Sequence, residues 1–213
     1  MNWSQPIDLY CERTDPSFWA EPVNAVTNVS FLIAALVAFL QWRRTDARDW
    51  PTAMLIALTA TIGVGSFIFH TVATRGAALF DTVPIAIFIY GYLFFALRRY
   101  LGLTLVASLA WLTAFVAFSY AEIAIVPRGT LNGSHTYLPA VCVTLLLGWM
   151  TRQQTTGRLL IAAAATLALS LTFRSIDADI CGAFPLGSHF LWHSLNGAAL
   201  YLLLRAAMLR PAV

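Results

Sequence analysis

Residues 52–70 read TAMLIALTATIGVGSFIFH, a run of apolar and small side chains that ends at His70. One helical span through the hydrocarbon core of a bilayer needs about 20 such residues. The run therefore predicts a transmembrane helix with an imidazole at one end. Similar runs follow one another along the chain. We predict seven spans, at residues 24–42, 52–70, 79–97, 101–120, 137–151, 157–173 and 189–205.

The composition supports this fold class. Hydrophobic residues make up 59% of the chain and charged residues 11%, and the mean hydropathy is +0.72. Soluble domains usually carry about 25% charged residues, which disfavours the alternative of a soluble domain with a very large core. We predict an all-α membrane protein, a seven-transmembrane helix bundle over residues 24–213. An extramembrane N-terminal segment, residues 1–23, precedes it, and its Pro16 and Pro22 argue against one continuous helix.

The charges divide unequally between the two sides of the predicted spans. Nine of the 13 basic residues, all Arg, fall on one side. The positive-inside rule then places the N-terminus outside and the C-terminus in the cytoplasm, which requires an odd number of spans. The first twenty residues lack the pattern of a cleavable signal peptide. We interpret the basic side as a topology signal rather than a nucleic-acid patch. Its members are Arg43, Arg44, Arg48, Arg98, Arg99, Arg152, Arg158, Arg205 and Arg210, with Asp46 and Asp49 the only acids there.

Three histidines give the main indication of function. His189 and His193 are four residues apart, so they share one helix face. The predicted spans bring His70 to the same membrane depth. Ionisable groups inside membrane spans are rare and usually functional. Three His ligands leave one coordination position open, as catalytic zinc prefers, so the set predicts a membrane-embedded metal enzyme.

Ser66 and Asp81 are predicted to lie at the same level as these histidines. Asp81 could transfer protons between a metal-activated water and a leaving amine, and the Ser66 hydroxyl could hydrogen-bond an oxyanion. For any one of the three histidines taken alone, the simpler alternative is a structural histidine that is packed or hydrogen-bonded in the protein. A Ser-His-Asp hydrolase built from Ser66, His70 and Asp81 leaves the other two histidines unexplained. We expect His135, in an outer loop, to be a surface residue.

The three cysteines differ in setting. Cys11 and Cys181 fall on the same predicted side and could form a disulfide that pins the N-terminal segment over the mouth of the bundle, although sequence alone leaves the pairing open. Cys142 is expected to be a small packing residue within the fifth span.

Four carboxylates cluster in the N-terminal segment. Such a cluster is either a solvated acidic loop or a set of hard oxygen ligands suited to Ca²⁺, and no EF-hand pattern is present. The acids are Asp8, Glu12, Asp15 and Glu21.

Taken in order, the motifs resemble the alkaline ceramidase family, which belongs to a superfamily of heptahelical membrane hydrolases that includes the adiponectin-type receptors. The likeness covers nearly the whole chain and is that of a bacterial-type member. The motifs are Cys11-Glu12, Ala20-Glu21-Pro22-Val23-Asn24, Gly65-Ser66 with His70, Asp81 before Pro84, Arg174 and Asp177 with Cys181, and His189 with His193.

This resemblance implies seven helices and hydrolysis of ceramide to a sphingoid base and a fatty acid. It further implies Zn²⁺ on His70, His189 and His193, catalysis by Asp81 with Ser66, and a Cys11–Cys181 disulfide. It also implies Ca²⁺ near the zinc, with Asp8, Tyr10 (through its carbonyl), Glu12 and Glu21 as ligands. The chain departs from the family pattern here, because an extra residue separates Asp8 from Tyr10 and Thr14 stands where Asn is expected.

We therefore expect a zinc-dependent intramembrane amidase whose partner is a membrane lipid, either ceramide or a related N-acyl lipid. No nucleic acid and no obligate protein partner are inferred. The expected location is a bacterial inner membrane, with the site toward the periplasm. The alternatives are a zinc-containing receptor or sensor without turnover, a hydrolase of another N-acyl lipid, and a transporter. A midplane site would be typical of a transporter, whereas the inner halves of the predicted spans are nearly free of ionisable groups.

Overall fold

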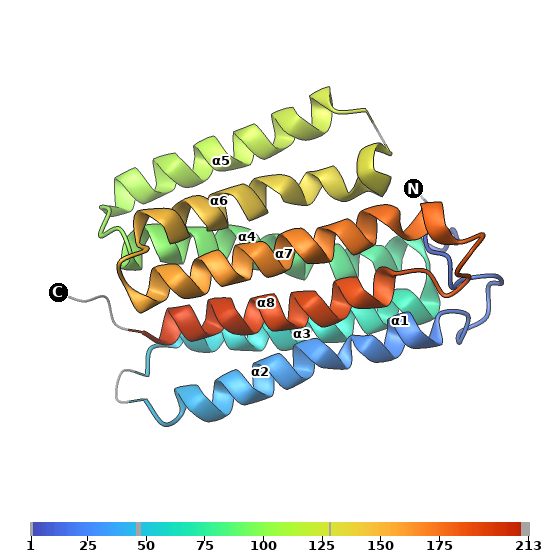
Figure 1. The fold of residues 1–213 in the computed structure, drawn as a ribbon, viewed down its shortest axis with the longest axis horizontal. Helices are drawn as coiled ribbons and strands as arrows, with labels where there is room; N and C mark the ends of the chain where they lie inside the picture. The colour runs from blue at the N-terminus through green and yellow to red at the C-terminus, as the bar shows by residue number, and fades with distance from the viewer. Residues whose placement is uncertain (1, 46–47, 128, 210–213) are drawn as a thin grey trace.

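The structure is a computed structural model and describes residues 2–45, 48–127 and 129–209. Three charged residues, Asp46, Arg128 and Arg210, lie outside the described residues. Long helices run side by side along the longest axis (Figure 1). The elements are α1 (Pro22–Thr27), α2 (Val29–Trp42), α3 (Trp50–Val72), α4 (Arg75–Arg99), α5 (Leu105–Ile125), the 3-10 segment η1 (Thr130–Tyr137), α6 (Leu138–Met150), α7 (Thr155–Ile180) and α8 (His189–Met208).

The all-helical fold agrees with the predicted class. Five helical segments among the described residues are long and apolar enough to cross a membrane, namely α1 together with α2, then α3, α4, α5 and α7. Helix α6 has only 13 residues, and α8 carries His189, His193 and Asn196. The multi-pass membrane character is therefore confirmed at the level of five candidate spans, and the count of seven stays a prediction.

A tight connection between α3 and α4 brings two expected site residues to one end of the bundle. Helix α3 ends at Ala73, which adopts a left-handed conformation with φ 45°. The next residue, Thr74, begins α4 by accepting a hydrogen bond from Ala77 N at 3.2 Å. The two helices therefore run antiparallel with almost no loop. His70 in the last turn of α3 and Asp81 in the second turn of α4 consequently lie at the same end.

The helices enclose an apolar pocket. Helix α3 packs between α2 and α4, and α8 packs between α2 and α7, with α6 beside α7. Side chains contributed by α2, α3, α4, α6, α7 and α8 line the pocket, which has a cavity volume of about 90 Å³. The aromatic side chains of Tyr92 and Trp192 both line it. The apolar lining is therefore suited to a hydrocarbon group.

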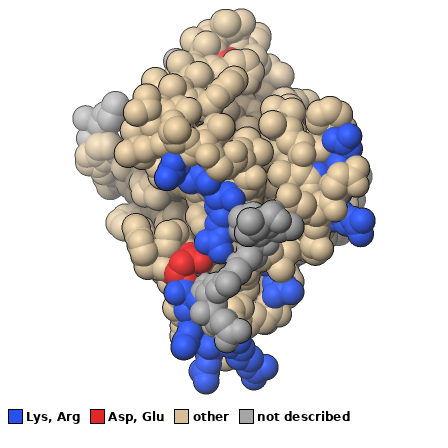
Figure 2. All heavy atoms as spheres, turned by 90° about the vertical axis from the view of Figure 1, so that its left-hand side faces the viewer, with Lys and Arg blue, Asp and Glu red and all other residues tan. Residues whose placement is uncertain are grey.

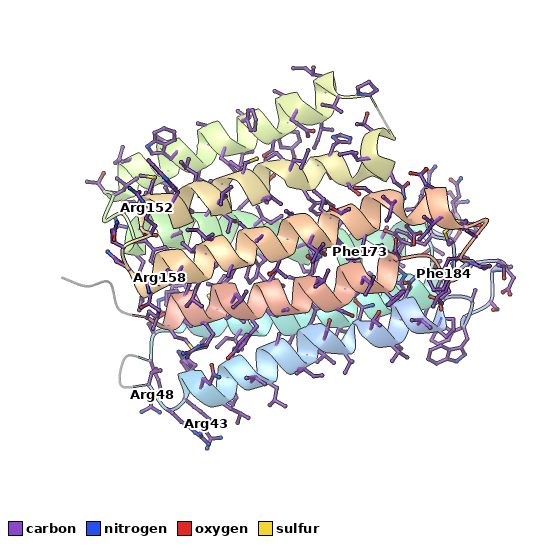
Figure 3. The ribbon with its side chains drawn as sticks, in the orientation of Figure 1. Arg43, Arg48, Arg152, Arg158, Phe173 and Phe184 are labelled. Carbon is purple, nitrogen blue, oxygen red and sulfur yellow. A yellow bond between two sulfur atoms is a disulfide. The ribbon has the colours of Figure 1, made fainter. Side chains whose placement is uncertain are left out.

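The two ends of the bundle carry different charges. Viewed end-on, one end shows a cluster of arginine side chains with one small acidic patch (Figure 2). Arg43, Arg48, Arg152 and Arg158 lie there, at the left in Figure 3. We call this the basic end, and we call the opposite end, which holds His70 and Asp81, the site end.

The N-terminal segment covers the site end. Cys11 and Cys181 form a disulfide with a Cα–Cα distance of 5.2 Å, which confirms the expected pairing. Ile7 N also donates to Ala73 O at 2.8 Å, so the segment is tied to the α3–α4 connection as well as to the end of α7. The segment thus forms part of the bundle's closed end.

Two minor predictions were wrong. His135 is only 6% exposed, and its Nδ1 lies 2.6 Å from Glu122 Oε1, so it joins η1 to the end of α5 instead of facing outward. Cys142 is exposed rather than packed inside. Helix α6 is apolar on nearly every face, so its sequence does not indicate which face turns toward its neighbours.

Candidate metal centre

Three histidines from two helices converge at the site end. His70 comes from the last turn of α3, and His189 and His193 come from the first turns of α8. One potential ligand atom from each residue lies within 4.8 Å of the others, and each residue is 1% exposed. Among the described residues, these three histidines form the one group of His, Cys, Asp or Glu side chains that could hold a metal ion. The predicted convergence of the three imidazoles is therefore present in the fold.

Each imidazole has a buried nitrogen without a protein partner. His70 Nε2, His189 Nδ1 and His193 Nε2 have no hydrogen-bond partner among the described residues. A buried polar nitrogen without a partner costs free energy, about 1–3 kcal/mol for each group. Three of them facing one small volume would be costly unless something binds there. A metal ion satisfies all three together, and three neutral imidazoles are a donor set that suits zinc.

The opposite nitrogens of two rings are held by the N-terminal part of the chain. His70 Nδ1 lies 2.6 Å from Glu21 Oε2, and His193 Nδ1 lies 3.0 Å from Thr27 Oγ1. With the proton on each Nδ1, the Nε2 atoms are free to act as ligands. Burial by itself would raise the pKa of the Glu21 carboxyl, but its bonds with His70 and Arg13 outweigh burial and hold that pKa below its usual value. Glu21 is thus a carboxylate that orients the His70 ring, as carboxylates commonly do for histidines that bind zinc.

Asp177 orients the third ligand, a role that the sequence did not reveal. Its Oδ1 accepts hydrogen bonds from Ser188 N at 2.6 Å and His189 N at 2.9 Å, at the start of α8. Its Oδ2 accepts from Cys11 N at 3.1 Å. A Cβ on Gly187 would lie 2.2 Å from Asp177 Oδ1, and this glycine has φ +67°, so both conformation and space call for glycine. The spacing of the Arg174 and Asp177 motif was the only signal in the sequence.

Asp81 and Ser66 lie beside the histidines. A Cβ on Gly65 would be 1.9 Å from Phe80 O, so α3 and α4 touch backbone to backbone at this level. Asp81 is close enough to Ser66, His70 and Arg174 for its carboxyl to interact with all three. It stays partly exposed, whereas Ser66 is buried. The expected catalytic pair is thus next to the three histidines and outside the group that could hold a metal ion.

Arg174 is a further charged residue near the centre. Its Nη1 donates to Ser134 Oγ at 2.8 Å and to Asn132 O at 3.1 Å, and its guanidinium lies 5.5 Å from the ring centroid of Trp192. Figure 3 shows the neighbouring Phe173 on the site-end side of α7, away from the labelled arginines of the basic end. The sequence placed Arg174 in a motif but did not predict its position next to Asp81.

The expected calcium ligands are arranged differently from the histidines. The two oxygens of Glu12 accept from Val23 N at 2.7 Å and Asn24 N at 2.8 Å, so this carboxylate binds the first turn of α1. The two carboxylate oxygens of Glu21 are hydrogen-bonded to Arg13 and to His70. Tyr10 O accepts from the backbone N–H of Arg13 at 3.2 Å. The described residues do not bring Asp8 and these groups together as a metal-binding set. Protein donors bind both carboxylate oxygens of Glu12 and of Glu21 and the carbonyl of Tyr10, so these three groups do not fit a calcium ion.

The apolar pocket adjoins the metal centre. Phe31 and Trp192 both line it, and their rings lie 6.5 Å from His193 and 6.4 Å from His189, centroid to centroid. Tyr10 covers the centre from the other side, with its ring stacked on His189 at 3.6 Å. The centre is therefore closed by the N-terminal segment and open toward a lipid-like interior.

Comparison with known proteins agrees with this site. The sequence model of the family described as Ceramidase matches residues 9–210, which include the three histidines, Ser66 and Asp81. No curated protein matches the chain. The match covers nearly the whole chain, and we conclude that the protein belongs to the ceramidase family.

Proposed function

We propose that the protein is a zinc-dependent intramembrane amidase that hydrolyses ceramide to a sphingoid base and a free fatty acid. The observation that carries the proposal is the set of three buried imidazole nitrogens without partners, next to Asp81 and at the end of an apolar pocket. The family match supports the reaction class, and the pocket supports a lipid substrate. The ligands are His70, His189 and His193.

The substrate lies with an apolar chain in the pocket and its amide at the site end. Phe31, Tyr92, Leu147 and Leu200 are among the side chains that would surround the chain. Polar groups are concentrated where the amide would lie, which are the histidines, Ser66 and Asp81. This separation of apolar and polar surface fits a molecule with a long hydrocarbon chain and one polar linkage.

The residues of the site divide the work of amide hydrolysis. Zinc bound by three neutral imidazoles supplies Lewis-acid chemistry, which makes water a nucleophile near neutral pH. Asp81 accepts the proton of the attacking water and then delivers it to the departing amine nitrogen. Ser66 donates its hydroxyl hydrogen bond to the oxygen that develops negative charge. The Tyr10 ring on His189 and the disulfide behind it limit the entry of bulk water.

We further propose that the basic end faces the cytoplasm and the site end faces the periplasm of a bacterial inner membrane. The cluster of arginines at one end supports this orientation by the positive-inside rule. The disulfide at the site end supports the same orientation, because disulfides persist in oxidising compartments. Residues 24–213 would then form a seven-span catalytic domain, with residues 1–23 as its outer cover.

The test is fatty-acid release from a fluorescent ceramide by the purified protein, beside Asp81→Asn and Asp179→Asn variants. Asp179 is an exposed carboxylate at the same end and serves as the matched control. Asp81→Asn removes the proton acceptor and should lower kcat by about 10²–10⁴-fold, with zinc content unchanged. The control should retain wild-type turnover.

Absence of turnover in a zinc-loaded wild type would contradict the ceramide assignment. The same assay with other N-acyl lipids then distinguishes a different lipid amidase from a receptor, which would bind such lipids without releasing fatty acid. Full activity in Asp81→Asn would leave ceramidase activity in place but reject the role of Asp81.

A further inference from the structure

Arg13 is a buried cation in the middle of the N-terminal segment. The residue is 7% exposed, and every hydrogen bond it donates from its guanidinium goes to an oxygen of this chain. Nε donates to Glu21 Oε1 at 2.5 Å, Nη2 to His70 O at 2.9 Å, and Nη1 to Asp15 O at 3.2 Å and Ser17 O at 3.3 Å. One carboxylate and three carbonyls around a positive charge resemble the oxygen shell of a bound metal ion.

Arg13 contacts His70 in two ways, directly at its backbone and through Glu21 at its side chain. The guanidinium binds the main chain of His70 directly, in the last turn of α3, where carbonyls lack helical partners. It also binds Glu21, whose second oxygen holds the side chain of the same histidine at 2.6 Å. A positive charge at a helix C-terminus is also favourable by itself. One guanidinium therefore fixes the backbone and, through Glu21, the imidazole of His70.

We propose that Arg13 is a built-in cation that stands where family resemblance implies calcium, and that it positions His70 for zinc without any calcium ion. The inference rests on the proposed zinc centre. Calcium near Glu21 would face the positive charge of Arg13 and would compete with N–H donors for the oxygens of Glu12 and Glu21. A guanidinium supplies a positive charge, as calcium would. It also presents N–H donors in a rigid planar arrangement, and a calcium ion has no such directional donors. Arg13 is thus a positioning residue and does not touch the substrate.

The structure indicates how large the effect should be. Arg13 and Glu21 have side chains that are 4% and 3% exposed, so removal of the guanidinium leaves a buried carboxylate with one fewer partner. His70 would then lose the contact on its carbonyl and the fixed orientation of Glu21. Loss of an outer partner of a metal ligand typically lowers metal affinity by about 10–100-fold. We expect that range for Arg13→Gln.

Zinc affinity is the measurement that tests the proposal. Purified wild type, Arg13→Gln, Arg13→Lys and the control Arg75→Gln are titrated against a competing zinc chelator, each in calcium-depleted buffer without EGTA and in the same buffer with calcium chloride. Arg75 is an exposed arginine at the same end of the bundle. The wild type and Arg75→Gln should bind zinc equally tightly, with no change when calcium chloride is added. Arg13→Gln should bind about 10–100-fold more weakly. Arg13→Lys should be intermediate, because lysine restores the charge without the rigid planar donors.

Two results would overturn the proposal. One is a wild type whose zinc affinity or melting temperature rises when calcium chloride is added to the calcium-depleted buffer, since calcium would then bind despite Arg13. The other is zinc-loaded Arg13→Gln within threefold of the wild type. If Arg13→Gln does not fold, the Arg13→Lys comparison and the calcium series on the wild type still decide the matter. A wild type that binds no zinc at all would refute the proposed function, whereas an unaffected Arg13→Gln refutes only this inference.

Discussion

Gly65→Ala should disable the enzyme through geometry alone. The new Cβ would lie 1.9 Å from Phe80 O, whereas ordinary contacts begin near 3.4 Å. Helix α4 must therefore move away from α3 by about 1.5 Å at this level. Phe80 precedes Asp81, so the carboxylate moves with it relative to the histidines. A misplacement of about 1 Å in a catalytic group can cost about 10²-fold in rate.

We expect kcat for ceramide to fall by about 100-fold, equivalent to about 2.7 kcal/mol in the activation barrier. Overpacking of this kind also lowers stability, by about 1–3 kcal/mol. The zinc ligands are on α3 and α8, so zinc content should stay close to one ion per chain. Fatty-acid release at saturating substrate, zinc content by mass spectrometry and the melting temperature are measured together.

Gly91→Ala is the matched control, because it places the same methyl group on α4 where nothing lies within 4 Å. It should retain wild-type kcat. Gly65→Ala that is folded, zinc-loaded and within threefold of wild-type kcat would refute the argument that the α3–α4 contact sets the position of Asp81. Loss of zinc in Gly65→Ala would show that the contact supports His70 instead.

Three further outcomes are expected. Ser66→Ala should lower kcat by up to about 10²-fold with little change in KM or zinc content, as measured by steady-state kinetics, because the lost hydrogen bond forms mainly in the transition state. Removal of zinc with a chelator should abolish turnover and lower the melting temperature. The free energy of unfolding should fall by up to about 4 kcal/mol if zinc had been present at 1,000 times its Kd. Added zinc should restore both turnover and melting temperature. At Asp49, burial would raise the carboxyl pKa, but Thr52 and Arg99 outweigh it and hold the pKa low. Its stabilising effect should therefore be present above the unfolded-state pKa and lost as the pH falls through the lowered folded-state value. Melting curves of wild type and Asp49→Asn should converge at low pH, and a constant difference would contradict this reasoning.

The helical fold and the convergence of the metal ligands were predictable from sequence for simple physical reasons. Long apolar runs need helices in a bilayer, and a four-residue spacing puts His189 and His193 on one face. Successive spans run in opposite directions, so the end of the span that carries His70 lies on the same side of the bundle as the start of the span that carries His189 and His193. The length of an apolar run, the spacing of two histidines and the alternating direction of successive spans can all be read from a single sequence.

The partners that orient the ligands were not predictable in this way. Asp177 reaches the start of α8 across the disulfide-linked loop, and Arg13 reaches the end of α3 across 57 residues of sequence. His135 was expected at the surface because nothing in its neighbourhood along the chain reveals Glu122, 13 residues earlier. Acidic residues in the N-terminal segment indicated a cation, but composition alone cannot show that the cation is the chain's own arginine.

Residues 1–23 have no apolar periodicity, yet they contact His70 and His189, and Thr27 at the end of α1 contacts His193. Glu21 holds His70, Thr27 holds His193, and Tyr10 stacks on His189. A zinc ion bound by the three histidines would therefore be coupled to the docking of this segment, because each orients the other through the same rings. A loosened segment should weaken zinc binding, and loss of zinc should loosen the segment, since linkage between two such equilibria is reciprocal. The disulfide would then serve the proposed metal centre as well as stability, because it ties the segment to the end of α7.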